Sequence, residues 1–159
     1  MTIGTAKFCS VPHLGALVSE LDALAGRMTG PEITKILGSS SLHIDDVMPF
    51  ITPSSAAYSR QRVARTEAYE ILVITWLPGQ ATGAHDHAGS VSAFKILSGT
   101  AHETLFTQAA DSLVDPIGTR EMHKGAVRID EGNGIHAVRN ECPPQRTSGE
   151  YSRVCTTPA

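Results

Sequence analysis

Apolar residues in the first third of the chain recur at helical spacing. Between residues 10 and 28 they fall three or four positions apart, which predicts a helix with Ser10 as its N-cap and Gly30-Pro31 as its end. The same spacing predicts a short helix beginning at Pro31 and another over Leu42–Met48, ended by Pro49. About residues 10–50 are therefore expected to form a helical segment that packs against the main body.

After residue 57 the pattern changes to short stretches separated by turn residues. Tyr69–Trp76 is rich in β-branched and aromatic residues, which predicts a central strand. Val91–Leu97 and Thr100–Phe106, joined by Ser98-Gly99, predict a hairpin, followed by a polar loop from Thr107 to Gly118. Further strands are expected at Tyr58–Val63, Thr119–Met122, Ala126–Ile129, Ile135–Val138 and Tyr151–Thr156. Many short strands at close spacing are typical of a β-sandwich or a small β-barrel. We expect one mainly β domain over residues 1–159, with the barrel at about 57–157.

Composition narrows the range of partners. A net charge of −3, with scattered Lys and Arg, argues against nucleic acid and against a membrane surface. No apolar run approaches the roughly 20 residues of a membrane-spanning helix, and Met1–Lys7 has no signal-peptide pattern. The three cysteines, Cys9, Cys142 and Cys155, are widely spaced without a Cys-x-x-Cys, which predicts reduced thiols in a cytoplasmic protein.

The candidate chemistry centres on the stretch Gly79–His87, which reads GQATGAHDH. If His85 and His87 lie on an extended strand, their side chains point the same way, and the preceding glycines allow a tight turn. A third histidine, His136, lies in the segment 134–140, which reads GIHAVRN. Three neutral imidazoles that leave coordination positions open suit Fe, Zn, Cu, Ni or Co. The other histidines are isolated, and we expect His102 and His123 to be solvated.

These motifs resemble those of the cupin superfamily. Gly79, five residues and then His85-x-His87, with Gly99 closing the turn, resemble its first motif, and His136-x-x-x-Asn140 resembles the end of its second. The glutamate that usually follows the first pair is missing, because residues 88–92 hold no carboxylate. Three histidines without that glutamate resemble the thiol dioxygenase branch, and cysteine dioxygenase in particular. Other segments agree with that family's pattern: Tyr58-x-Arg60, Trp76, Ser90 and Glu103–Phe106.

The resemblance implies one Fe(II) per chain, held by His85, His87 and His136. It implies an enzyme that adds both atoms of O₂ to the sulfur of a small carboxylated thiol, cysteine-like or 3-mercaptopropionate-like, to give a sulfinate. Arg60, with Tyr58 beside it, would pair with the substrate carboxylate, which a planar guanidinium matches with two hydrogen bonds. The alternative for Arg60 is a surface arginine on an edge strand. The expected partners are the thiol and O₂, and the expected state is a monomer or weak oligomer.

Two departures from the family keep alternatives open. Ser92 stands where the family can have a cysteine crosslinked to a C-terminal tyrosine, so no thioether can form there. The family's C-terminal Ser-x-His-x-Tyr pattern is met only by residues 152–156, with Val154 and Thr156 replacing histidine and tyrosine. Ser152 and Thr156 remain the candidates for hydrogen-bonding residues around the iron, and Tyr58 or Tyr151 for a substitute hydroxyl. Another metal-dependent cupin oxygenase of a biosynthetic pathway, or a non-catalytic metal- or ligand-binding cupin, fits the same histidines.

Overall fold

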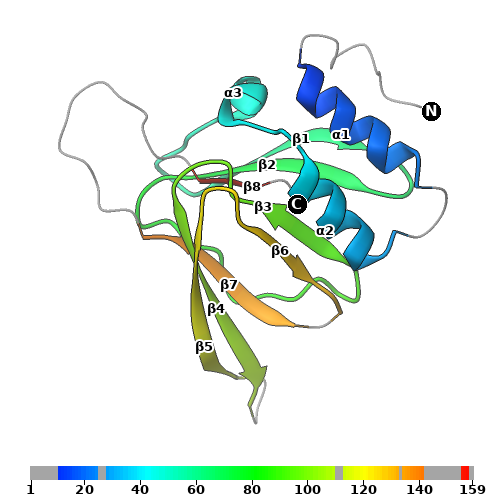
Figure 1. The fold of residues 1–159 in the computed structure, drawn as a ribbon. Coiled ribbons are helices and arrows are strands. Elements are labelled where there is room, and N and C mark those ends of the chain that lie inside the picture. Colours follow the sequence, from blue (N-terminus) through cyan, green and yellow to red (C-terminus); the bar gives the residue numbers. More distant parts are fainter. Residues whose placement is uncertain (1–10, 25–27, 110–112, 133, 142–154, 158–159) are drawn as a thin grey trace.

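Antiparallel strands form the main body of the molecule, and helices from the N-terminal third cover one side of it (Figure 1). The computed structural model describes residues 11–24, 28–109, 113–132, 134–141 and 155–157, the last three by their backbone only. The mainly β fold with an N-terminal helical segment, predicted from the sequence, is confirmed.

The helical segment contains α1 (Pro12–Asp22), α2 (Gly30–Ser39), α3 (Ile44–Val47) and a 3₁₀ turn (Met48–Phe50). Helix α1 is shorter than the predicted 10–28, and Ser10 lies outside the described residues. Helix α2 begins earlier than predicted because Thr29 and Glu32 form a capping box at its start. Helix α3 begins two residues later than predicted and ends at Val47, and Pro49 lies inside the 3₁₀ turn that follows it. No helix in the described ranges is long and apolar enough to cross a membrane.

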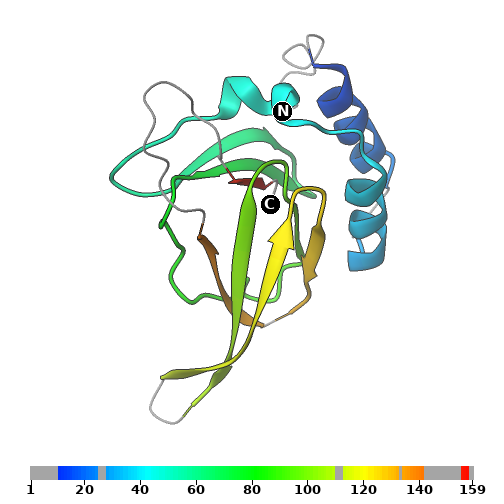
Figure 2. The same cartoon turned by 60° about the vertical axis from the view of Figure 1, so that its left-hand side comes forward.

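The described residues contain eight strands, which form three antiparallel sheets. The first sheet has the order β1-β2-β8, the second pairs β3 with β6, and the third has the order β5-β4-β7. The bounds are β1 Ser59–Arg65, β2 Glu70–Trp76, β3 Ser92–Lys95, β4 Thr100–Gln108, β5 Val114–His123, β6 Val127–Asp130, β7 Ile135–Asn140 and β8 Cys155–Thr157. Figure 2 shows α1 and α2 along one side of the strands, and the β4–β5 hairpin extending away from the body.

Two sequence predictions about the strands are wrong. Strand β3 pairs with β6 and not with β4, because the chain crosses from one sheet to another at Ile96–Gly99. Ile96 and Leu97, predicted as the last residues of the first hairpin strand, lie after the end of β3 at Lys95 and are both buried. The polar loop predicted from Thr107 to Gly118 is mostly strand, because β4 continues to Gln108 and pairs there with Val114 of β5. Its polar residues suit a hairpin that stands out into solvent.

The apolar residues form two clusters, one on each side of β2. Ile71 and Val73 face the helices and pack with Leu14, Leu17 and Leu37. Trp76 faces the other way and packs inside the barrel with a second group: Phe94, Ile96, Ala101, Met122 and Val138. Because both faces of β2 are covered, its sequence is almost continuously apolar, as predicted for a central strand. The outer cluster holds the helices in place, and the inner cluster forms the floor of the site described below.

Lys95 of β3 ties helix α2 to the barrel. Its side chain is buried, and Nζ donates to the carbonyl oxygens of Leu37 (3.0 Å) and Ser40 (2.6 Å) and to Ser40 Oγ (3.2 Å) at the end of α2. Burial lowers the pKa of Lys95 from its usual value. The lysine therefore caps the carbonyl end of the helix from outside it.

Replacing Lys95 by methionine is expected to lower the free energy of unfolding by about 1 kcal/mol. The hydrogen bonds of the ammonium group are lost, while relief from burying a charge offsets part of that loss. Urea denaturation of the two proteins measures the difference. Lys35→Met, on the exposed side of the same helix, is the control and is expected to leave stability unchanged. Equal or higher stability of Lys95→Met would contradict a role in holding α2.

Candidate metal centre

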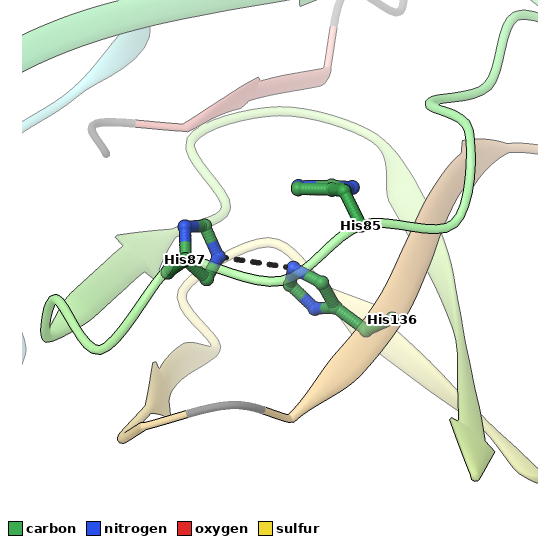
Figure 3. Close-up of side chains that lie close together, drawn as sticks. All are labelled: His85, His87 and His136. Atoms are coloured by element: carbon green, nitrogen blue, oxygen red, sulfur yellow. Dashed lines mark hydrogen bonds between the residues drawn. The ribbon is translucent and has the colours of Figure 1, made fainter. Parts of the chain in front are cut away.

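Three histidine rings converge between a loop and a strand. His85 and His87 come from the connection between β2 and β3, and His136 comes from β7 (Figure 3). One ring nitrogen from each histidine lies within 4.8 Å of the others. His87 Nε2 and His136 Nε2 are 3.1 Å apart. The structure therefore brings together the three residues that the sequence singled out.

Backbone hydrogen bonds hold the loop against β7. His85 and His136 exchange two N–H to O=C bonds of 2.9 Å each, and Thr82 N–H donates to the carbonyl of Val138 (2.9 Å). These contacts form isolated bridges and not the regular strand on which the sequence argument placed His85 and His87. The bridge still sets His85 directly opposite His136. The placement of His85 depends on backbone pairing with β7 more than on the alternation of side chains along a strand.

Left-handed backbone conformations bound the loop on both sides. Gly79 has φ +82° just after β2, and Ala88 and Gly89 have φ +49° and +79° just after His87. Asp86 Oδ1 accepts the backbone N–H of Ala88 (3.1 Å), which supports the second turn. The glycine-rich approach predicted to turn tightly is thus confirmed at Gly79, and a second tight turn follows His87.

Asn140 anchors the loop at its β2 end. Its side-chain amide donates to the carbonyl of Trp76 (3.0 Å) across the interior. Its backbone carbonyl accepts the N–H of Gly79 (2.8 Å), and its own N–H donates to the carbonyl of Gln80 (3.0 Å). The residue that ends the second sequence motif therefore positions the loop that carries the first.

Hydrogen bonds at Nδ1 make Nε2 the nitrogen that two of the rings offer to a cation. His85 Nδ1 lies 2.9 Å from the carbonyl of Gly83, and His136 Nδ1 lies 2.8 Å from Glu103 Oε1. Since a carbonyl and a carboxylate only accept, both Nδ1 atoms donate, and each Nε2 carries a lone pair when the ring is neutral. Burial, with the neighbouring rings of His136 and His85, lowers the pKa of His87, which favours its neutral form.

These donors fit a transition metal. Metal–nitrogen bonds to histidine measure about 2.0–2.1 Å, so two nitrogens that bind one ion lie at most about 4 Å apart. The Nε2 atoms of His87 and His136, at 3.1 Å, meet this limit. Neutral imidazoles suit Zn, Cu, Fe or Ni, so donor type alone leaves the metal open. The centre is therefore a histidine triad able to hold a metal.

A small cavity of about 70 Å³ adjoins the three histidines. Arg60 and Tyr58, the predicted substrate-binding residues, both line it. Tyr58 stacks on Trp76 with ring centroids 5.8 Å apart. The remaining wall residues are Ile74, Thr82, Ser92, Phe94 and Val138. The wall is mostly apolar, with one guanidinium and a few hydroxyls.

Trp76 lines this cavity and carries a buried indole N–H group. Its side chain is 2% exposed, and its Nε1–H has no hydrogen-bond partner within the described part of the chain. Buried N–H groups usually have a partner. The indole N–H of Trp76 is therefore an exception to this rule, next to the three histidines.

A larger cavity in the described part of the chain lies away from the histidines. Its volume is about 550 Å³, and it is found between the helices and the β1–β2 turn, with Leu17, Leu37, Tyr69 and Ile71 in its walls. It includes none of the three histidines. Because the titratable donors converge on the smaller cavity, that cavity is the candidate site despite its size.

The C-terminal candidates are only partly placed. Ser152 and Tyr151 lie outside the described residues, as does Val154. The backbone of β8 pairs with β2 and sets Thr156 opposite Thr75, next to the cavity-lining Trp76. The side chain of Thr156 is outside the described part, so its predicted role stays a prediction.

A buried group behind His136 was missed by the sequence argument. The sequence places Glu103 only within a segment that matches the family, and it indicates no role for Asp130, Arg120 or Arg128. In the structure, all four lie around His136 or around the carboxylate it contacts. One signal was available: Glu103 follows Ala101 by two positions on β4 and so shares its buried face.

Comparison with solved structures identifies the fold. The protein TT1209 from Thermus thermophilus is 19% identical, with a TM-score of 0.53, over 74% of this chain and 97% of that one. A protein with a double-stranded β-helix domain from Klebsiella pneumoniae is 20% identical, with a TM-score of 0.50, over 70% and 83% of the two chains. The cupin domain of Cnp3 from Schizosaccharomyces pombe is 15% identical, with a TM-score of 0.50, over 70% and 67%. At these identities the likeness shows a shared cupin fold.

The sequence itself matches a narrower group. Residues 29–148, about three quarters of the chain, match the model of the family described as cysteine dioxygenase type I. The matched range contains all three histidines together with Arg60 and Tyr58, and it ends before the divergent segment 152–156. The chain therefore belongs to the cysteine dioxygenase type I family of cupin proteins.

Proposed function

We propose that this protein is a non-haem Fe(II) thiol dioxygenase that acts on a small carboxylated thiol, cysteine-like or 3-mercaptopropionate-like. The thiol R–SH and one O₂ would give the sulfinic acid R–SO₂H, so that both oxygen atoms reach the sulfur. One observation carries this proposal: three imidazoles converge beside Arg60 in one cavity, in a chain of this family. Iron(II) held by His85, His87 and His136 would supply the redox chemistry with O₂ that protein side chains lack.

The chain's own residues prepare the site for an anionic sulfur ligand. Gly83 and Glu103 fix the Nδ1–H tautomers of His85 and His136. Three neutral ligands would leave the charge of a bound cation uncompensated, which favours a thiolate as the next partner. The triad contains no carboxylate of the kind that would compete with it.

Arg60 and the cavity walls support a small carboxylated substrate. A guanidinium binds a carboxylate through two parallel hydrogen bonds, and Arg60 lines the same cavity as His85 and His87. Ligand pockets for drug-sized molecules measure about 300–1,000 Å³. A cavity of about 70 Å³ suits a substrate of only a few heavy atoms. Its apolar wall would keep water from the reacting sulfur.

Oxygen uptake with a panel of thiols tests this function. Protein loaded anaerobically with iron is expected to consume one O₂ for each thiol converted and to yield a sulfinate, identified by mass spectrometry. Carboxylated thiols are expected to react faster than cysteamine, which lacks the carboxylate. Apoprotein and zinc-loaded protein are the controls, since neither has a redox-active metal.

Each alternative predicts another outcome. A product oxidised elsewhere than on sulfur would identify a different oxygenase chemistry. Iron binding without oxygen uptake on any thiol would indicate a non-catalytic metal- or ligand-binding cupin. Ser92 lines the cavity at a position where the family can have a cysteine. This departure from the family pattern is the reason for testing both alternatives.

A further inference from the structure

Glu103 lies directly behind His136, inside the barrel. Its side chain is fully buried at 0% exposure, and its two carboxylate oxygens have different partners. Oε1 accepts the Nδ1–H of His136 at 2.8 Å. Oε2 lies 3.1 Å from Arg120 Nε and 3.3 Å from Arg128 Nε. A buried carboxylate is costly unless it is paired and hydrogen-bonded, and these partners supply both conditions.

Asp130 adds a second carboxylate to the same group. Its Oδ2 is 3.2 Å from His136 Nδ1, and its Oδ1 is 3.8 Å from a terminal nitrogen of Arg128. Oδ2 has no hydrogen-bond partner among the described residues. A single N–H forms one well-aligned hydrogen bond, and here Glu103 accepts it. Two carboxylates thus contact one imidazole, two guanidiniums contact those carboxylates, and the formal charges of the four groups cancel.

We propose that Glu103 is a positioning residue for the metal, and that Arg120 and Arg128 set how strongly it acts on His136. This inference rests on the proposed metal centre. A carboxylate that accepts the Nδ1–H of a metal-binding histidine fixes the ring's tautomer and orientation, and it makes Nε2 a stronger donor. The guanidiniums draw the negative charge of Glu103 toward Oε2 and away from His136. A cation bound by His136 would therefore keep more of its positive charge than Glu103 alone would allow.

Removing the carboxylate charge and removing a guanidinium charge are expected to shift the midpoint potential of a bound iron in opposite directions. Glu103→Gln keeps the shape but removes the charge, so His136 becomes a weaker donor. We expect iron affinity to fall about 10- to 100-fold, and the Fe(III)/Fe(II) midpoint potential to rise. Arg128→Gln leaves the carboxylate less neutralised, so His136 becomes a stronger donor and the midpoint potential falls. A purely structural role would not produce shifts of opposite sign.

The test measures Fe²⁺ affinity by chelator competition and the midpoint potential by spectroelectrochemistry, with urea denaturation to monitor folding. Matched controls are Glu121→Gln, an exposed carboxylate near His102 and His123, and Arg139→Gln, an exposed arginine paired with Glu141. Both controls are expected to match the wild type. If Glu103→Gln does not fold, Arg128→Gln and Arg120→Gln decide the question, because both should lower the potential.

Unchanged affinity and potential in Glu103→Gln would overturn the inference, as would shifts of the same sign in Glu103→Gln and Arg128→Gln. A wild type that binds no iron would overturn both this inference and the proposed function. Neither the affinity nor the potential measurement uses a thiol, so the inference on Glu103 can be tested separately from the proposed function. Opposite shifts in a protein that oxidises no thiol would refute the proposed function alone, and sulfinate formation without any shift would refute this inference alone.

Discussion

Replacing His136 by alanine is expected to leave the protein without bound iron. Two imidazoles from one loop would remain, and the ligand that joins the loop to β7 would be gone. Even a partner outside the ligand set changes metal affinity by about 10- to 100-fold, so the loss of one of three ligands should exceed that range. Metal analysis after anaerobic loading and desalting measures the iron retained per chain.

Two further variants make this result specific to the site. His102→Ala removes a histidine from β4 whose ring contacts Glu121 and Glu141, away from the triad, and is expected to retain full iron content. His87→Ala removes a half-buried ligand from the loop and leaves the Glu103–His136 hydrogen bond in place. We therefore expect this variant to fold, so that a loss of iron reports the loss of a ligand. Full iron stoichiometry in either His136→Ala or His87→Ala would remove that residue from the ligand set.

The local pattern of apolar residues was enough to predict helices and strands whose environment repeats along their length. The helical spacing of Leu14, Leu17 and Leu21 reflects one buried face, and all three are buried in the structure. The run Ile71–Trp76 is covered on both sides, so its composition alone indicates a central strand. In these cases the environment of a residue repeats along the element, and the sequence records that repeat.

The sequence contains no comparable signal for which strands pair with each other. Strand β3 pairs with β6, and Ser92 lies opposite Asp130. The nearer strand β4 looked like the better partner because a Ser-Gly turn separates them. Choosing between a local and a distant partner depends on the packing of Ile96 and Leu97 in the core, which is a property of the assembled barrel.

The metal centre also contains residues that the sequence predicted and residues that it did not. His85, His87 and His136 were predicted from motif spacing and family resemblance, and the structure brings them together. The charged group behind His136 was not predicted, because Glu103 and Asp130 come from strands that never pair with each other. Buried charges look like surface residues in a sequence until their partners are known. Site residues that act through another residue are therefore the hardest to predict.

Replacing Arg60 by glutamine is expected to raise the KM for a carboxylated thiol about tenfold or more. Hydrogen bonds to a charged group contribute about 1.5–3 kcal/mol, and the lower end applies because Arg60 is exposed and water screens its charge. The rate at saturating substrate should change less than KM, since the guanidinium binds the carboxylate and not the sulfur. Steady-state oxygen uptake over a range of thiol concentrations separates the two quantities.

The neighbouring Arg62 provides the matched control. It lies two residues further along β1, but its guanidinium pairs with Glu70 and it is not among the residues that line the small cavity. Arg62→Gln is therefore expected to leave KM unchanged. A thiol without a carboxylate, such as cysteamine, should react equally well with the wild type and Arg60→Gln, because it has no group for Arg60 to bind. If Arg60→Gln left the KM for carboxylated thiols unaltered, or impaired cysteamine to the same extent, Arg60 would not be the carboxylate-binding residue. Substrate selection would then rest on Tyr58, Trp76 and the other walls of the cavity.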